Sequence, residues 1–310
     1  MTFGKILDRV FQLVRANWRL FGGIALAPAA WIIAYYGAMF AAFFPVLKPL
    51  ILQQQPHLSL MTIVWLFVAY ILGWILTIVI YALYEPAAVY AALEANTGTR
   101  VTFGKAWAVA WRKAGRYIWL AILRALIVML PIMVFAAVIG GAAGLALVRG
   151  QGGSNPYAAM MALPLFMLLY VGSMVYAVLV VLRLALAVPA CVAEDVSAWK
   201  GIRRSNQLTY GAKGRIFLLA LLMYAIAYAA FLVAELVIFF LGAVVALVGM
   251  ALHLAMAPWG FIGIGVAAVI FLCALLAYAA CIGAAFSTTF AVVYHDQRLR
   301  REGVAAAPAG

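Results

Sequence analysis

Long uncharged stretches set the overall pattern of the chain. Six of them carry no charged residue or only one, at positions 20–47, 58–84, 117–148, 157–192, 216–252 and 254–294. A helix crosses the hydrocarbon core of a bilayer with about 20 apolar residues, so each stretch is long enough for one crossing. The last stretch exceeds one crossing, and we expect Pro258 with Gly260 to mark where its helix begins. The pattern predicts an all-α, polytopic integral membrane protein with six transmembrane helices.

Short amphipathic segments lead into the first and third stretches. In the first segment, apolar residues recur at steps of three and four, as on one face of a helix: Phe3, Ile6, Leu7, Val10, Phe11, Val14 and Trp18. The second segment has the same kind of stripe, formed by Phe103, Ala106, Trp107, Ala110 and Trp111. Such helices suit a membrane interface, with aromatic side chains at the acyl boundary and cations near anionic headgroups. The alternative is that they only anchor each pair of spans and do not recognise specific lipids.

These segments belong to an internal repeat. Thr2-Phe3-Gly4-Lys5 recurs as Thr102-Phe103-Gly104-Lys105, and Ser197-Ala198-Trp199-Lys200 keeps the hydroxyl, the aromatic and the lysine. Thr and Ser are residues that cap the N-termini of helices. We predict three parallel units, at about 2–98, 102–193 and 197–296, each a basic amphipathic interfacial helix followed by an αα-hairpin of two spans. Together they form a single membrane domain at 1–303, with a disordered C-terminal tail at 304–310.

Composition and charge agree with a membrane location. Of the 310 residues, 69% are hydrophobic and 9% are charged, which excludes a soluble globular domain. The formal net charge is +13, from 21 Lys and Arg against 8 Asp and Glu. Most of these cations lie before the first span, between the second and third, between the fourth and fifth, and after the sixth. The positive-inside rule then places both termini in the cytoplasm, in a bacterial-type inner membrane, and explains the charge without a nucleic-acid partner.

The basic residues of the three entry segments are the candidate contacts for lipid headgroups. We expect anionic headgroups, or a partner protein, to bind at this side of the membrane. The candidates are Lys5, Arg9, Arg15, Lys105, Arg112, Lys113, Arg116, Lys200, Arg203 and Arg204.

Four ionisable residues are expected at membrane depth: Glu85, Arg124, Arg183 and Glu235. A charge at that depth is costly and usually has a partner. Glu85 is close enough in depth to pair with either Arg124 or Arg183, whereas Glu235 is expected near the outer interface. The four residues could line a polar cavity that opens to the cytoplasm, or they could form buried ion pairs that lock the helices together.

Catalytic and metal-binding patterns are missing from the sequence. His57 and His253 fall in outer loops and His295 at the inner end of the last span, so no two histidines share a helix. No Cys/His spacing typical of a zinc site occurs among the three cysteines. We therefore expect no enzymatic activity, no cofactor and no bound metal.

Three stretches resemble one known family. They are Phe3-Gly4-Lys5-Ile6-Leu7-Asp8-Arg9-Val10-Phe11 with Arg15 and Asn17; Arg204-Ser205 with Leu208-Thr209-Tyr210-Gly211; and Thr288-Thr289 with Val293-Tyr294-His295-Asp296-Gln297-Arg298 and Arg301-Glu302-Gly303. In this order they resemble the glycerophosphoryl diester phosphodiesterase membrane-domain family, with His295 in place of a second tyrosine. The resemblance implies a polytopic helical domain. It does not imply catalysis, because a catalytic barrel needs about 250 residues and only seven follow Gly303.

Two functional hypotheses follow from the sequence. The first is a non-enzymatic scaffold that holds anionic lipids or a partner protein at a basic cytoplasmic face. The second is a transporter or channel for a small solute or lipid, with a path lined by Glu85, Arg124 and Arg183.

Overall fold

The computed structural model describes residues 3–51, 60–148, 156–251 and 258–303, and all of the regular structure in these residues is helical. Thr2, His57, His253 and the predicted disordered tail lie outside the described residues. The helices are α1 (Phe3–Ala16), α2 (Trp18–Ile51), α3 (Leu60–Asn96), α4 (Phe103–Arg112), α5 (Ala114–Val148), α6 (Pro156–Leu184), α7 (Ala187–Ala193), α8 (Ala198–Thr209), α9 (Lys213–Ala251) and α10 (Pro258–Glu302).

Six of these helices are long and apolar enough to cross a membrane: α2, α3, α5, α6, α9 and α10. This confirms the predicted all-helical class and the predicted number of helices that are long and apolar enough to span a membrane. The last long helix begins at Pro258, as expected. Thr102 caps α4, because its Oγ1 accepts a hydrogen bond from the backbone nitrogen of Lys105 at 3.4 Å. Ser197 precedes α8, but its side chain makes no capping hydrogen bond.

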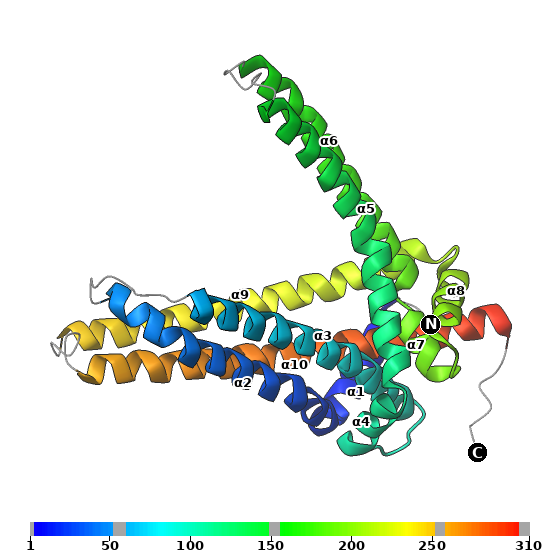
Figure 1. Cartoon of the computed structure of the whole chain (residues 1–310). Coiled ribbons are helices and arrows are strands. Elements are labelled where there is room, and N and C mark those ends of the chain that lie inside the picture. Colours follow the sequence, from blue (N-terminus) through cyan, green and yellow to red (C-terminus); the bar gives the residue numbers. More distant parts are fainter. Residues whose placement is uncertain (1–2, 52–59, 149–155, 252–257, 304–310) are drawn as a thin grey trace.

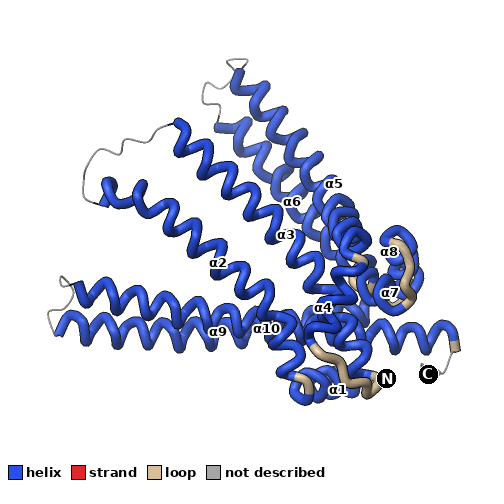
Figure 2. Tube along the Cα trace, turned by 60° about the horizontal axis from the view of Figure 1, so that its bottom comes forward, coloured by secondary structure: helices blue, strands red, loops and turns tan. Residues whose placement is uncertain are grey.

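The long helices run as three neighbouring pairs, α2 with α3, α5 with α6, and α9 with α10, which spread away from one common end (Figures 1 and 2). The pair α5–α6 leans away from the other four long helices (Figure 1). The short helices α1, α4, α7 and α8 gather at the common end, where the end of α10 also lies. We call this end of the molecule the basal end.

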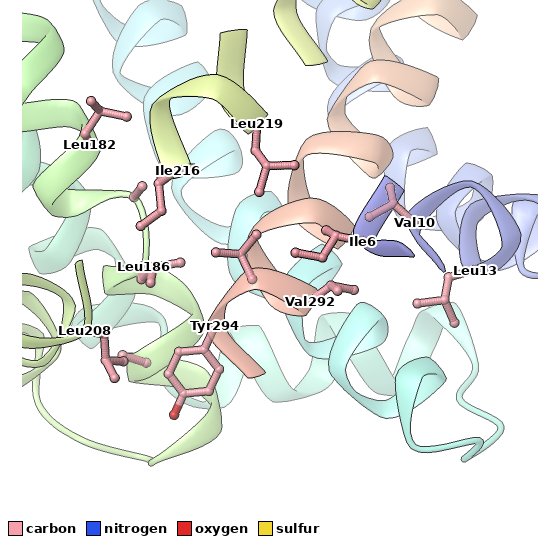
Figure 3. Packing of buried hydrophobic residues seen from close by; sticks show 13 residues of the cluster. Ile6, Val10, Leu13, Leu182, Leu186, Leu208, Ile216, Leu219, Val292 and Tyr294 are labelled. Carbon is pink, nitrogen blue, oxygen red and sulfur yellow. The ribbon is translucent and has the colours of Figure 1, made fainter. Parts of the chain in front are cut away.

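The buried core lies at the basal end rather than along the long helices (Figure 3). Ile6 and Val10 of α1 are each 1% exposed and pack with Val292 and Tyr294 of α10. Fully burying such a side chain stabilises a fold by roughly 1.5–3 kcal/mol. The aliphatic part of the first amphipathic stripe therefore packs in the protein core.

The apolar stripes of α1 and α4 are divided between protein and surroundings. Phe11 of α1 is 47% exposed, and Trp18, which ends the stripe and begins α2, is 64% exposed. In α4, Ala106 and Ala110 are buried, while Phe103 and Trp111 are 58% and 59% exposed. The division follows residue size and position, since the small or aliphatic residues face the neighbouring helices.

Small residues allow the helices near the basal end to approach closely. Ala87 and Ala91 of α3, Ala106 of α4 and Ala284 of α10 are buried in one cluster. Close approach of backbones through small residues is the usual means by which membrane helices associate. Beyond this region the long helices expose large apolar side chains, such as Trp65 and Leu72 of α3, as hydrocarbon surroundings require.

One predicted span is interrupted. The stretch at 157–192 forms α6 and then the separate short helix α7, with the break after Leu184. The hydroxyl of Ser205 in α8 donates to the carbonyl oxygen of Arg183 at 2.6 Å and accepts from the backbone nitrogen of Leu186 at 3.2 Å. The buried Ser205 thus supplies hydrogen bonds to backbone groups at the break, which lets the chain turn there.

Candidate functional site

The ten candidate headgroup contacts fall into two groups in the structure. Six are exposed and make no ion pair with any residue in the described ranges: Lys5, Arg15, Lys105, Arg112, Lys200 and Arg203. The other four are held by specific partners within the protein. The sequence pattern did not separate these groups, because the partners come from distant parts of the chain.

The four engaged cations join helices at the basal end. Arg9 of α1 donates to the side chain and to the backbone oxygen of Asn96 at the end of α3, both at 3.2 Å. Lys113 binds Asp195 at 2.6 Å, and Arg116 binds the same carboxylate oxygen. These hydrogen bonds, the one from Lys113 first, lower the pKa of Asp195 below its ordinary value. Asp195 follows α7, so this ion triplet fastens the end of α7 to the start of α5.

Exposed aromatic residues accompany the six exposed cations. Trp18 is 64% exposed beside Arg15 and Arg19, and the guanidinium of Arg19 lies 5.4 Å from the centre of its ring. In α8, Trp199 is 54% exposed and precedes Lys200. Together with the aromatic residues of α4, they give each of the three entry segments an exposed aromatic next to an exposed cation. Aromatic rings and cations of this kind are enriched at membrane–water interfaces.

A second ion network joins two of the motifs that carry the family resemblance. Arg204 of α8 binds both carboxylate oxygens of Glu194, at 2.9 and 3.1 Å, and also pairs with Glu302 at the end of α10. Glu302 also accepts from Arg298 at 3.1 Å. The buried hydroxyl of Tyr294 donates to Glu194 at 2.7 Å.

Further contacts join α10 to the start of α9 and to the loop before it. Arg215 of α9 binds Asp296 of α10 at 3.0 Å, and Arg301 donates to the carbonyl oxygen of Tyr210. Asp296 also accepts from Arg300 at 3.0 Å. Sequence reasoning did not assign Glu194, Tyr294, Asp296 or Glu302 to a site, although the third stretch of the family resemblance contains the last three.

The membrane-depth candidates are only partly brought together. Arg124 of α5 binds Glu85 of α3 at 2.7 Å, so the structure selects Arg124 as the partner of Glu85. Arg183 is exposed at the end of α6 and makes no ion pair with any residue in the described part of the chain. The same is true of Glu235 in α9, which is also exposed.

A cavity of about 490 Å³ surrounds the Glu85–Arg124 pair. It lies between α3, α5 and α6, and its other walls include Tyr81, Val128 and Met129. A second cavity, of about 460 Å³, lies between α6 and α9. It is apolar, with Val178, Leu182 and Phe217 in its wall, except where Lys213 lies at the start of α9.

No cluster of three or more potential metal ligands occurs among the residues that the structure describes. Comparisons of the chain with models of known families, with curated proteins and with solved structures find no match. What the geometry itself offers is a basal surface of cations and aromatic rings, together with two cavities that border the long helices.

Proposed function

We propose that this integral membrane protein is a non-enzymatic scaffold that binds anionic phospholipid headgroups at its basal end. The observation that carries the proposal is the division of the ten candidate cations. Six of them project from the described structure without an ion-pair partner, and they lie on helices that gather at one end of the molecule, where like charges repel one another. A phosphate-bearing surface would neutralise them, and each Lys or Arg near an anionic membrane contributes about 1 kcal/mol.

The position of these cations also supports an interfacial role. They lie on α1, α4 and α8, which gather at one end of the molecule beyond the apolar surfaces of the long helices (Figure 1). The exposed aromatic residues Trp18, Trp111 and Trp199 lie on or directly after the same three helices. The excess of basic residues at this end supports a cytoplasmic location by the positive-inside rule, in the inner membrane of a bacterial-type cell.

The second cavity, between α6 and α9, could hold the acyl chain of the lipid. The part of α6 from Met174 to Leu182 gives this cavity an apolar wall, and Lys213 lines it at the start of α9. An anionic phospholipid fits this arrangement, with its phosphate at Lys213 and one acyl chain against Val178 and Leu182.

The family resemblance belongs to the same proposal. Parts of the second and third motifs share ion pairs, and α1, which carries the first motif, packs on α10. We infer that the chain is similar to the glycerophosphoryl diester phosphodiesterase membrane-domain family, and that these motifs hold the basal end together. The transporter alternative has less support, because Arg183 does not lie in the wall of the cavity that holds Glu85 and Arg124.

Two variants that change the net charge equally test the proposal. Lys105→Gln removes one exposed cation. The control, Lys113→Gln with Arg116→Gln and Asp195→Asn, removes an ion triplet and also lowers the net charge by one. Each protein is purified in detergent and titrated with phosphatidylglycerol, and bound lipid is counted by native mass spectrometry.

We expect Lys105→Gln to weaken phosphatidylglycerol binding about fivefold, and the triplet variant to weaken it less. An equal or larger loss in the triplet variant would show that exposed basal cations do not hold the lipid, and the proposal would be abandoned.

A further inference from the structure

The cavity between α3, α5 and α6 carries one charge of each sign. Glu85 and Arg124 lie in its wall, and their side chains are 40% and 28% exposed. Arg124 lies eight residues beyond Arg116 on α5, about 12 Å further along the helix axis. The pair is therefore well inside the apolar part of the molecule, and the cavity as a whole is neutral.

Both ions keep unused hydrogen-bonding capacity. The pair uses Nη1 of Arg124 and Oε2 of Glu85, and within the described residues it is the one side-chain hydrogen bond that either residue makes. A guanidinium has five N–H donors and a carboxylate has about four acceptor positions. The cavity can therefore supply further donors from Arg124 and further acceptors from Glu85 without breaking the ion pair.

The walls around the pair are apolar and exposed toward the surroundings of the long helices. Ile78 and Tyr81 of α3, Met129 of α5 and Val181 of α6 line the cavity and are all 42–52% exposed. The pair α5–α6 leans away from α3 beyond the basal end (Figure 1). An occupant of this cavity would thus place its apolar part directly in the bilayer.

We propose that this cavity binds the headgroup of a zwitterionic phospholipid with a primary ammonium group, of the phosphatidylethanolamine class. Its phosphate lies at Arg124 and its ammonium at Glu85. This site goes beyond the proposed function, because it concerns another lipid class at another place in the molecule.

Charge balance selects this occupant over an anionic lipid. A lone phosphate would compete with Glu85 for Arg124 and leave a net negative charge at membrane depth, which is costly. A zwitterion adds no net charge and gives each ion a partner of opposite sign. A primary ammonium also donates N–H hydrogen bonds to Glu85, which the quaternary ammonium of phosphatidylcholine cannot do.

The first test uses the unaltered protein. The delipidated protein in detergent is titrated separately with phosphatidylethanolamine, its N-methylated and N,N-dimethylated forms, phosphatidylcholine and phosphatidylglycerol, all with the same acyl chains. Native mass spectrometry gives the dissociation constant for each lipid. We expect affinity to fall with each methyl group, and equal affinity for phosphatidylethanolamine and phosphatidylcholine would overturn the proposal.

The second test locates the site. The variant Glu85→Gln/Arg124→Gln removes both charges and keeps a polar side chain at each position. The control Glu235→Gln/Arg183→Gln removes one exposed carboxylate and one exposed guanidinium from other long helices. We expect the first variant to weaken phosphatidylethanolamine binding at least about tenfold. Its affinity should also no longer depend on the number of methyl groups on the lipid nitrogen. We expect the control to retain both.

Equal binding of phosphatidylethanolamine by the two variants would place the lipid elsewhere and refute the site. This outcome is distinct from a failure of the proposed function, which is measured with phosphatidylglycerol and with variants of basal cations.

Discussion

The hydroxyl of Tyr294 donates a hydrogen bond to Glu194 Oε1 at 2.7 Å, across a separation of 100 residues in the chain. Tyr294 lies in α10 and Glu194 directly after α7, so this bond joins the last long helix to a segment from the middle of the sequence. Arg204 binds the same carboxylate from α8. One carboxylate thus connects three elements that meet at the basal end.

Removing this hydroxyl should destabilise the basal end. In Tyr294→Phe the ring still fills the core, but Glu194 loses one of its two donors. Because hydrogen bonds to charged groups contribute about 1.5–3 kcal/mol, we expect a loss of that size in the free energy of unfolding in detergent. The control is Tyr210→Phe, since the side chain of Tyr210 is 70% exposed. If both variants unfold alike, the bond between Tyr294 and Glu194 contributes no stability.

Asp195 should make the stability of the protein depend on pH in the acid range. Lys113 and Arg116 lower its pKa in the folded state, so the ion triplet stabilises the fold above the unfolded pKa of about 3.9. That stabilisation is lost as the pH falls through the lowered, folded-state pKa. The variant Asp195→Asn keeps a residue type that tolerates the positive φ of 51° at this position.

The measurement is the difference in unfolding temperature between the wild type and Asp195→Asn, from neutral pH down to about pH 3. We expect the wild type to be more stable at neutral pH and the difference to shrink below about pH 4. A difference that stays constant throughout this range would contradict the assignment to the Asp195 charge.

Gly73 should be intolerant of a side chain. A Cβ atom at this position would lie 1.9 Å from a ring carbon of Tyr35, whose hydroxyl donates to the carbonyl oxygen of Tyr70 at 3.0 Å. We expect Gly73→Ala to separate α2 from α3 and to lower the free energy of unfolding by about 1–3 kcal/mol.

Gly172→Ala in α6 is the matched control, because nothing lies within 4 Å of its added Cβ. It should be neutral or slightly stabilising, since Ala favours a helix over Gly by about 1 kcal/mol. The double variant Gly73→Ala/Tyr35→Ala should recover part of the loss, and no recovery would argue against the clash as its cause.

Ser205 should be essential to the break between α6 and α7. Ser205→Ala removes hydrogen bonds to the carbonyl oxygen of Arg183 and the backbone nitrogen of Leu186. An unsatisfied buried polar group costs about 1–3 kcal/mol, so we expect a loss of at least this size in the free energy of unfolding. Ser173→Ala serves as the comparison, because Ser173 bonds to the carbonyl oxygen of Tyr170 in an exposed position. Equal effects of the two substitutions would show that Ser205 does not support the break.

The number of long helices could be predicted from the sequence because the requirement for a span is local. About 20 consecutive apolar residues satisfy it, whatever the rest of the chain does. The start of α10 at Pro258 and the cap at Thr102 are local in the same sense. The break after Leu184 was missed because its cause, Ser205, lies on another helix.

In the candidate site, too, local features could be predicted and contacts between distant residues could not. Residue type and spacing identified Lys105 and Lys113 equally as headgroup contacts, and they did not reveal that Asp195 neutralises Lys113. Spacing also left Glu85 with two guanidinium partners at similar depth, and only the packing of α3 against α5 selected Arg124. A favourable pair depends on the distance between two side chains, which spacing along the chain does not give.

The order of residues along the chain is enough to predict a helical membrane protein, the stretches that can span the bilayer and the segments where basic residues concentrate. Which cations are held by the protein, and which face of α1 is buried, depends on how the helices pack. The two kinds of property differ in the distance along the chain over which they are set. Helix formation and transfer into a bilayer depend on neighbours within a few turns. Hydrogen bonds and ion pairs such as those of Glu194 with Tyr294 and Arg204 depend on where distant segments meet.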